Sequence, residues 1–221
     1  MRIPSDTELI TFDGWTLRVR PASRQPARLL LLLHGWTGDE NSMWVFVRSF
    51  SLDYWIIAPR APYATEPSGY SWRAPRAPQS ATRGWPSLED FRSSADALIA
   101  LVDDYAVQNQ MNAGQFDVIG FSQGAALTNA ITLLYPERVR RAGVLSGFLP
   151  EGSESLMEKR PLSGKPFFVA HGTLDEMVKI EYARQSVGML ECAGASVTFH
   201  EDEIGHKLSA NGLHALEEYF S

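Results

Sequence analysis

The sequence predicts one α/β domain built around a mainly parallel, doubly wound sheet. Short apolar runs that suit strands buried on both faces alternate with segments whose apolar residues recur at helical spacing. Strands that alternate with helices in this way form a parallel sheet with helices on both faces. A chain of 221 residues suits one large domain better than two small ones, so the expected domain spans residues 1–221.

The composition is that of an ordinary globular protein and argues against some functions. Hydrophobic residues make up 44% of the chain and charged residues 21%. The net charge of −6 argues against a general affinity for nucleic acids or anionic membranes. The most apolar run, at residues 29–33, is far too short to span a bilayer, and the first residues lack the apolar core of a signal peptide. We therefore expect a cytoplasmic protein.

The first strands are predicted near the N-terminus. Residues 8–20 alternate apolar and polar side chains around Asp13-Gly14, which predicts an antiparallel hairpin that opens the sheet. Residues 28–33 form a continuous apolar run, typical of a strand buried on both faces. The elements expected next are a glycine-bearing loop at residues 34–40, a short helix at 41–50 and a second buried strand at 54–58.

A different kind of segment occupies residues 59–86. It contains 6 of the chain's 13 prolines, together with several Tyr and Trp residues. Loops this long are uncommon in compact domains and are often functional, and the aromatic residues argue against a disordered linker. Two compatible interpretations stay open: an irregular surface excursion packed by its own aromatics, and a flap that forms one wall of a substrate pocket.

The second half continues the alternation of helices and strands. Apolar residues at helical spacing predict a helix within residues 87–110, and Ser87 with Asp90 resembles a capping pair at its start. The further elements expected are a strand ending at Phe121, a helix that runs to Tyr135, strands at 142–145, 166–170 and 196–200, and helices at 180–192 and 209–220.

A serine framed by glycines is the first candidate for chemistry. Ser122 lies in Gly120-Phe121-Ser122-Gln123-Gly124, between an apolar run and a segment rich in helix formers. This is the strand, sharp turn and helix of a G-x-S-x-G nucleophile elbow. Glycines are needed two positions on either side because a serine at strained dihedrals on a tight turn leaves no room for side chains there. The motif also occurs by chance, so its context must decide.

A serine nucleophile needs a base, and the chain has only five histidines. His206 lies in the loop between the last predicted strand and the last predicted helix, where the histidine arrives when the order is Ser, then Asp or Glu, then His. We favour His206 over His200, which ends that strand. His214, three positions before Glu217, is expected to be a solvated helix residue.

The base in turn needs an acid that orients it, and that acid should follow an intervening strand. Asp175 lies in a turn just beyond the apolar run at residues 166–170 and is the preferred candidate. The alternative role for this residue is to cap the following helix at its N-terminus. The fallback candidates for the acid are Glu176, Asp202 and Glu203.

An oxyanion hole needs two backbone N–H groups near the serine. Gln123 supplies one, because it follows the nucleophile and begins a helix whose dipole favours negative charge. The second is expected from the loop after an early strand, with Trp36 as the preferred donor and Thr37 as the second choice. His34 is expected to stabilise this loop rather than to perform acid–base chemistry.

No other chemistry competes well with a serine nucleophile. The sequence contains no Cys-x-x-Cys, no His-Glu-x-x-His and no phosphate-binding glycine-rich pattern. Its histidines and acidic residues do not show metal-ligand spacing. Cys192 is the only cysteine, so no intrachain disulfide is possible, and we expect it to be a buried or half-buried apolar residue.

Together these motifs resemble a known family. The segments that carry the resemblance are Leu33-His34-Gly35, Gly38-Asp39-Glu40-Asn41, Gly120-Phe121-Ser122-Gln123-Gly124, Leu145-Ser146-Gly147, His171-Gly172-Thr173-Leu174-Asp175 and Gly205-His206, in this order. The chain is similar in these segments to the phospholipase/carboxylesterase family of α/β-hydrolases, whose best-known branch is the acyl-protein thioesterases. The resemblance runs from about residue 29 to the C-terminus.

The resemblance implies an α/β-hydrolase fold and a serine hydrolase that cleaves carboxylic esters or thioesters. It implies a triad of Ser122, Asp175 and His206, with Gln123 and Trp36 as oxyanion donors. It also implies that the protein uses no metal and no organic cofactor.

The substrate is less constrained than the chemistry. We expect a small-molecule ester or thioester, with Trp44, Trp72 and Trp85 lining the site that binds it. The alternatives are a peptidase or amidase on the same scaffold and a non-catalytic, hydrolase-like binding protein, since a fold does not decide a function. The oligomeric state is open, with a homodimer as one option.

Overall fold

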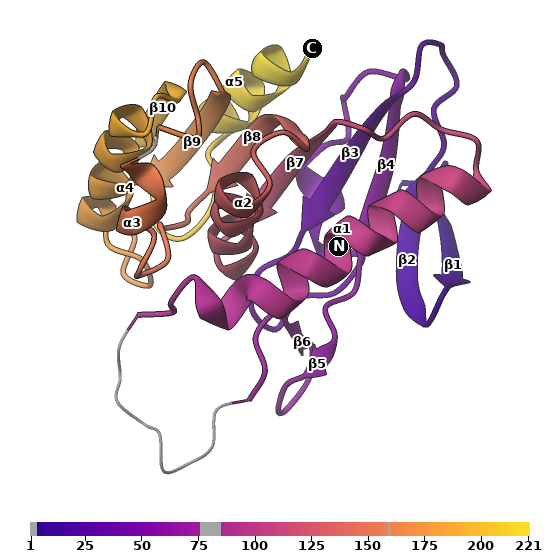
Figure 1. The fold of residues 1–221 in the computed structure, drawn as a ribbon, viewed down its shortest axis with the longest axis horizontal. Coiled ribbons are helices and arrows are strands. Elements are labelled where there is room, and N and C mark those ends of the chain that lie inside the picture. Colours follow the sequence, from indigo (N-terminus) through magenta and orange to yellow (C-terminus); the bar gives the residue numbers. More distant parts are fainter. Residues whose placement is uncertain (1–3, 76–84, 159) are drawn as a thin grey trace.

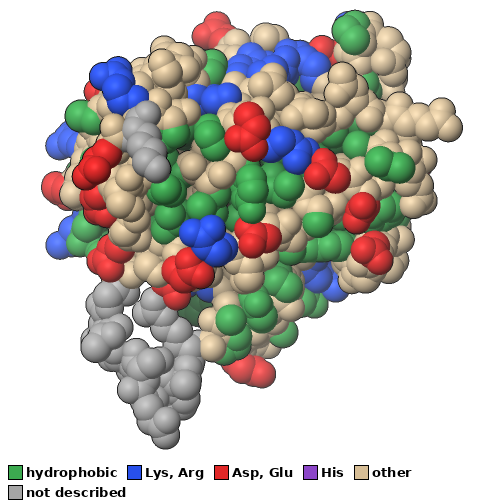
Figure 2. Space-filling model, in the orientation of Figure 1, with side chains coloured by type: hydrophobic (Ala, Val, Ile, Leu, Met, Phe, Trp, Pro, Cys, Tyr) green, Lys and Arg blue, Asp and Glu red, His purple; other side chains and the backbone are tan. Residues whose placement is uncertain are grey.

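A single eight-stranded sheet runs through the centre of the molecule and carries helices on both faces (Figure 1). The computed structural model describes residues 4–75, 85–158 and 160–221. Helices α1, α2 and α4 cover one face, and α5 lies on the other (Figure 1). On the face that carries α1 and α2, acidic and basic side chains are interspersed with hydrophobic ones (Figure 2).

The elements follow the predicted order along the chain. The strands of the sheet are β1 (Glu8–Phe12), β2 (Trp15–Arg20), β3 (Arg28–Leu33), β4 (Tyr54–Pro59), β7 (Phe116–Phe121), β8 (Val139–Leu145), β9 (Pro166–Gly172) and β10 (Ser196–Asp202). The helices are α1 (Glu89–Gln108), α2 (Gln123–Leu134), α3 (Glu154–Met157), α4 (Ile180–Cys192) and α5 (Ala210–Phe220). The helix expected at residues 41–50 is a 3-10 turn, η1 (Ser42–Phe46), and the short α3 is not anticipated by the sequence pattern.

The strand order is β1-β2-β4-β3-β7-β8-β9-β10. All neighbours from β4 to β10 are parallel, whereas β2 is antiparallel to both β1 and β4. The turn between β1 and β2 uses positive φ angles at both Asp13 (42°) and Gly14 (78°), as a two-residue hairpin requires. The predicted mainly parallel sheet with an N-terminal antiparallel hairpin is confirmed.

The apolar run of β3 divides its side chains between two cores. Leu29, Leu31 and Leu33 pack into the core beneath α1, α2 and α4, whereas Leu30 and Leu32 pack into the core beneath η1 and α5. Successive strand residues point to opposite faces, so a strand covered on both sides must be apolar throughout. This is why a continuous run of leucines identifies a central strand.

The predicted pair of Ser87 and Asp90 forms just before and within the first turn of helix α1, whose N-cap residue is Leu88. The Ser87 N–H donates to Asp90 Oδ2 at 2.7 Å, and the Asp90 N–H donates back to Ser87 Oγ at 3.3 Å. An aspartate can therefore form the reciprocal pair of hydrogen bonds called a capping box, in which glutamate is more usual.

Cys192 lies at the end of α4 and is exposed. The prediction that it is buried or half-buried is therefore wrong. The buried face of α4 is formed by Ile180, Ala183, Ser186 and Leu190. Cys192 is two residues beyond Leu190, about 200° further around the helix, and so faces solvent.

The segment at residues 59–86 is partly regular. Strands β5 (Tyr63–Ala64) and β6 (Tyr70–Ser71) form a small hairpin, and residues 76–84 lie outside the described residues. Trp72 follows this hairpin and is fully buried in the core beneath α1 and α2. Trp72 therefore anchors the first half of the segment to the main core.

A buried charge joins four elements at the end of the sheet away from Ser122. Asp117, at the start of β7, is fully buried and accepts hydrogen bonds from Arg140 Nη2 (2.5 Å) and Tyr54 Oη (2.6 Å). Arg141 Nη2 lies 3.3 Å from the same carboxylate and also donates to the carbonyl of Phe220 at 3.1 Å. Asp117 thus ties β4, β7, β8 and the end of α5 together. The ion pairs with Asp117 also explain why β8 begins at Val139 and not at the expected residue 142. They allow Arg140 and Arg141, which are not typical of a buried strand, to lie within it.

We expect Asp117→Asn to lower the free energy of unfolding by about 3 kcal/mol, because it leaves two partly buried arginines without a countercharge. Urea denaturation followed by circular dichroism measures the change. The matched control is Asp103→Asn, since Asp103 pairs with Arg138 at 2.5 Å but is 52% exposed. That variant should lose less than about 1 kcal/mol. Equal losses in the two variants would contradict the importance of the buried cluster.

Candidate active site

Ser122 lies on a strained turn between β7 and α2. Its backbone has φ 54° and ψ −115°, and its N–H donates to the carbonyl of Leu145 at 2.8 Å. A Cβ added at Gly120 would lie 2.1 Å from the carbonyl oxygen of Gly124, and one added at Gly124 would lie 2.1 Å from that of Leu33. Neither position therefore accepts a side chain, which is the steric requirement of an elbow.

His206 connects Ser122 to Asp175. Its Nε2 lies 2.9 Å from Ser122 Oγ, and its Nδ1 lies 2.6 Å from Asp175 Oδ2. Asp175 follows β9, and His206 lies between β10 and α5, so all three residues stand beyond the carboxyl ends of parallel strands. The structure brings together the three side chains that the sequence pattern selects. A carboxylate on Nδ1 favours the tautomer in which Nε2 accepts a proton from the serine.

The carboxylate of Asp175 is buried and held from several sides. Its Oδ1 accepts hydrogen bonds from the N–H groups of Met177 (2.8 Å) and Val178 (2.9 Å). Helix α4 begins only at Ile180, with Lys179 as its N-cap residue. Asp175 therefore closes a turn before the helix rather than capping the helix itself.

A second histidine approaches the same carboxylate. His171 Nε2 donates to the carbonyl of Val178 at 2.7 Å and lies 3.4 Å from Asp175 Oδ2. Burial lowers the pKa of His171 below its usual value, which favours the neutral ring. Sequence reasoning missed this contact, although the His-Gly pair at the end of an apolar strand marks the position.

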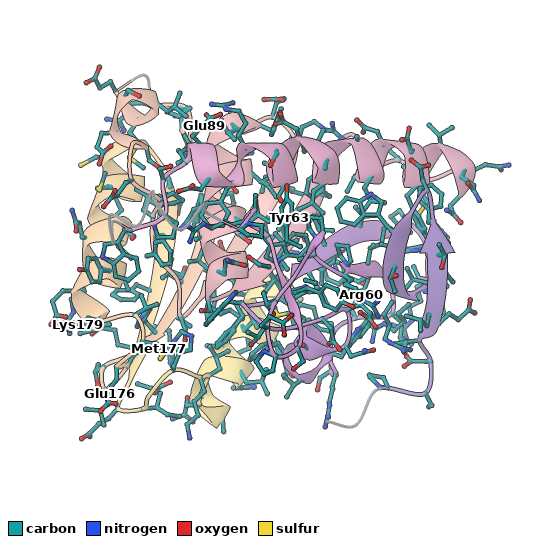
Figure 3. All side chains as sticks on the ribbon, turned by 90° about the horizontal axis from the view of Figure 1, so that it is seen from below. Arg60, Tyr63, Glu89, Glu176, Met177 and Lys179 are labelled. Atoms are coloured by element: carbon teal, nitrogen blue, oxygen red, sulfur yellow. The ribbon has the colours of Figure 1, made fainter. Side chains whose placement is uncertain are left out.

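The remaining acid and base candidates lie apart from Ser122. His200 Nε2 bonds to Asp202 Oδ2 at 2.9 Å, and Asp202 also accepts a hydrogen bond from Ser209 at the start of α5. Glu176 and Glu203 are exposed, and Figure 3 shows Glu176 near the edge of the molecule. His214 is also exposed, as predicted, and its side chain faces Glu218.

The loop after β3 lies directly against Ser122. A Cβ added at Gly35 would lie 3.4 Å from the Cβ of Ser122. The N–H of Thr37, the second choice for an oxyanion donor, already donates to the carbonyl of Tyr70 at 3.0 Å. Within the described residues, the N–H groups of Trp36 and Gln123 donate to no protein acceptor. Both N–H groups are therefore among those available to a substrate oxygen.

Residues 59–75 hold that loop in place. Trp72 Nε1 donates to the carbonyl of His34 at 2.8 Å, and the N–H of Ala61 donates to His34 Nε2 at 3.0 Å. Because His34 Nε2 accepts, its Nδ1 carries the proton and donates to the carbonyl of Gly35 at 2.7 Å. Burial lowers the pKa of His34, which keeps the ring neutral. His34 thus stabilises the loop, as predicted.

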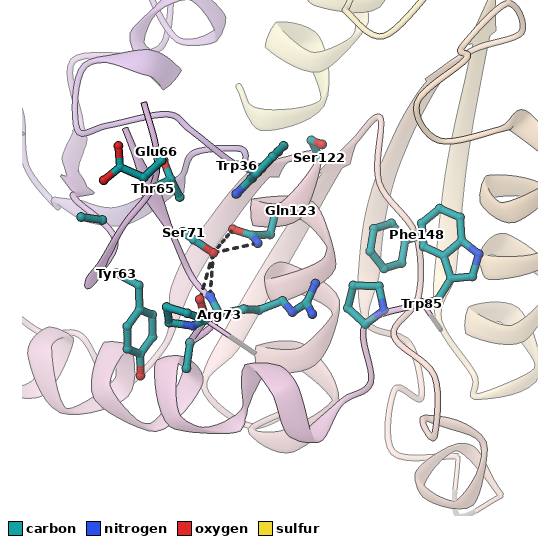
Figure 4. Close-up of a pocket in the computed structure, with 14 residues that line it drawn as sticks. Trp36, Tyr63, Thr65, Glu66, Ser71, Arg73, Trp85, Ser122, Gln123 and Phe148 are labelled. Atoms are coloured by element: carbon teal, nitrogen blue, oxygen red, sulfur yellow. Dashed lines mark hydrogen bonds between the residues drawn. The ribbon is translucent and has the colours of Figure 1, made fainter. Parts of the chain in front are cut away.

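Residues 59–75 also form hydrogen bonds with the side chain of Gln123, the residue after Ser122. Gln123 Oε1 accepts from the N–H of Trp72 at 2.9 Å. Gln123 Nε2 donates to Ser71 Oγ at 3.1 Å (Figure 4). One segment therefore fixes both the loop that carries Trp36 and the start of α2. Sequence reasoning missed Ser71, because no motif marks a serine that acts through a partner about 50 residues away.

A cavity of about 660 Å³ opens beside Ser122 and Gln123 (Figure 4). Trp85 lines it and packs against Phe148, with ring centroids 4.6 Å apart. The described residues that line the cavity are Trp36, Tyr63, Ala64, Thr65, Glu66, Ser71, Arg73, Ala74, Pro75, Trp85, Pro86, Ser122, Gln123 and Phe148.

Two of the three tryptophans expected at the substrate site do not line this cavity. Trp44 and Trp72 are both fully buried. Trp44 Nε1 donates to the carbonyl of Glu40 at 2.9 Å, and its ring packs in the core beneath η1 and α5. Both side chains are buried in the apolar cores of the protein, so neither can contact a substrate in the cavity. Only Trp85 stands where the sequence analysis expects a substrate contact.

Within the described ranges, no group of three or more His, Cys, Asp or Glu side chains is arranged to hold a metal ion. In the same ranges, no helix has the length and apolar character needed to cross a membrane.

Several known proteins are similar to this chain. A carboxylesterase structure from Mesorhizobium loti matches with a TM-score of 0.79 and 21% identity, over 97% of this chain and 98% of that one. This likeness shows the fold, which is that of the α/β-hydrolases. A probable carboxylesterase of Oryza sativa subsp. japonica is 38% identical over 104 residues, which are 46% of this chain but only 39% of that protein. Acyl-protein thioesterase 1 of Debaryomyces hansenii is 26% identical over 209 residues, which cover 83% of this chain and 85% of that protein.

The family model described as phospholipase/carboxylesterase matches residues 16–221, which is nearly the whole chain. The protein therefore belongs to the phospholipase/carboxylesterase family.

Proposed function

We propose that the protein is a serine hydrolase that cleaves small carboxylic esters or thioesters through an acyl-enzyme. The observation that carries the proposal is the hydrogen-bonded row of Ser122, His206 and Asp175 on an elbow beside a cavity. Membership of a family whose relatives include proteins named carboxylesterase and acyl-protein thioesterase supports the same class of reaction.

The reaction follows from the roles of five residues. Ser122 Oγ attacks the carbonyl carbon while His206 Nε2 takes its proton, and Asp175 holds the tautomer that permits this. The N–H groups of Gln123 and Trp36 stabilise the negative oxygen of the tetrahedral intermediate. His206 then gives its proton to the leaving alcohol or thiol. Water, activated by the same histidine, releases the acid from Ser122.

The volume and the lining of the cavity indicate what size of substrate it can hold. Trp85 and Phe148 present aromatic surfaces to it, and Trp36 stands at its edge with 59% of its surface exposed. A volume of about 660 Å³ is within the usual range for small-molecule sites. We therefore propose small esters or thioesters as substrates, with Trp85 as a contact residue.

We expect Ser122→Ala to lower kcat on a short-chain p-nitrophenyl ester by about 10⁵-fold or more, since the nucleophile is lost. A fluorophosphonate probe should label Ser122, and peptide mass spectrometry can identify the labelled residue. His206→Ala should abolish the labelling. The matched control is His214→Ala, at a histidine whose side chain is 72% exposed and faces Glu218. Turnover retained by Ser122→Ala would refute the assignment of the nucleophile.

We expect Gln123→Ala to lower kcat by about tenfold with a smaller change in KM. The variant keeps its backbone N–H but loses the side chain that bonds Ser71 and Trp72, so the oxyanion donors are less well positioned. Steady-state kinetics on p-nitrophenyl butyrate measure both constants. Gln115→Ala, at an exposed amide bonded to the carbonyl of Glu137, is the control and should change neither constant. A rise in KM at unchanged kcat would show that Gln123 only binds substrate.

A further inference from the structure

A second cavity, of about 270 Å³, adjoins the cavity beside Ser122. Among the described residues, only Trp85 and Phe148 line both of them. Figure 4 shows these two side chains together, on the opposite side of the first cavity from Tyr63. The second cavity lies against α4, which contributes Met189 to its lining. The hydrolysis steps make no use of this second space.

The indole of Trp85 forms a partition between the two cavities. Its ring centroid lies 4.6 Å from that of Phe148 and 4.3 Å from that of Tyr182 on α4. Carbon atoms in contact lie about 3.5–4.0 Å apart, so rings at this spacing leave no gap for an acyl chain. A chain that enters the first cavity would therefore meet the indole before it reached the second.

The backbone on either side of the partition is held independently of the indole. The N–H of Glu151 donates to the carbonyl of Pro86 at 3.0 Å, and the N–H of Leu88 donates to the carbonyl of Glu151 at 2.8 Å. The carbonyl of Phe148 accepts a hydrogen bond from Asn129 Nδ2 at 2.9 Å. Because surroundings of this kind relax only partially, a smaller side chain at position 85 should leave an opening.

The position of His206 indicates which part of an ester occupies the first cavity. In the proposed reaction His206 Nε2 gives its proton to the leaving group, so the leaving group must lie beside this nitrogen. Trp36, Ser122 and Gln123 line the cavity, whereas His206 is not among its described lining residues. An ester carbonyl at Ser122 whose oxygen faces Trp36 and Gln123 therefore directs its acyl chain into the cavity and its leaving group away from it.

We propose that Trp85 sets the longest acyl chain that the site accepts. The inference rests on the proposed hydrolysis at Ser122 and names its substrate class: esters or thioesters of short, apolar acyl groups. Each methylene that becomes buried along the cavity should raise kcat/KM by about fourfold. Once the chain reaches the indole, a further methylene must displace packed rings, which costs free energy.

The first test is the chain-length profile of the wild-type protein. The substrates are p-nitrophenyl esters from acetate to decanoate, each used below the concentration at which it forms micelles. Release of p-nitrophenol gives kcat/KM for each ester. The value should rise with chain length and then fall sharply at one length within the series. A value that keeps rising through decanoate would overturn the proposal.

Trp85→Ala should move this limit to longer chains, because the chain can then extend into the second cavity. For the ester two methylenes beyond the wild-type limit, kcat/KM should rise by about 10-fold or more. Trp85→Leu covers the case in which Trp85→Ala does not fold, since it retains an apolar side chain against Phe148 and Tyr182. It should move the limit in the same direction. An unchanged limit in a folded variant would overturn the role of Trp85.

Filling the second cavity distinguishes entry of the chain from a general loosening of the site. In the Trp85→Ala background, Met189→Trp adds a ring at the half-buried Met189 and should reverse the gain for long chains. The matched control in that background is Val107→Trp, at a residue that is 79% exposed and outside the described lining of both cavities. It should leave the gain intact.

A gain that Met189→Trp does not reduce would contradict entry into the second cavity and so overturn the inference. If no ester is hydrolysed in a Ser122-dependent way, the proposed function itself fails. Ser122-dependent hydrolysis with the same chain-length limit in wild-type protein and folded Trp85→Ala would overturn the role of Trp85 alone.

Discussion

The site depends on one close backbone contact, between Gly124 at the start of α2 and the carbonyl of Leu33 at the end of β3. A Cβ at Gly124 would lie 2.1 Å from that oxygen, so only glycine lets the helix come so near. The contact sets the loop after β3 against Ser122. Because β3 and β7 also pair at Leu33 and Gly120, the loops that leave these strands cannot separate without disrupting the sheet.

A second set of hydrogen bonds holds the loops that this contact brings together. His34 and Gln123 lie on different elements, and Trp72 bonds to both through its indole N–H and its backbone N–H. These groups are largely shielded from water, so losing a partner would cost free energy. The described first half of residues 59–86 is therefore part of the framework of the site. Donors held in this way before a substrate arrives need no reorganisation when negative charge develops on an oxygen.

The five histidines show how position decides what one residue type does. His206 stands in a half-buried loop between a serine and a carboxylate, which suits proton transfer. His34 and His171 are buried, with lowered pKa values, and bond to backbone groups as neutral rings. His200 pairs with a local aspartate, and His214 faces solvent. Burial and partners, rather than the motif around each histidine, separate these roles.

Local patterns in the sequence determined the sheet, its N-terminal hairpin, the elbow at Ser122 and the order in which Asp175 and His206 follow it. These features depend on strand and helix periodicity and on turn chemistry, which neighbouring residues carry. Only the tertiary structure decided that Trp44 and Trp72 belong to the cores, that Cys192 is exposed and that Ser71 bonds to Gln123. The physical reason is that such outcomes depend on which face of an element a side chain takes and on partners far away in the chain. No short pattern records either of these.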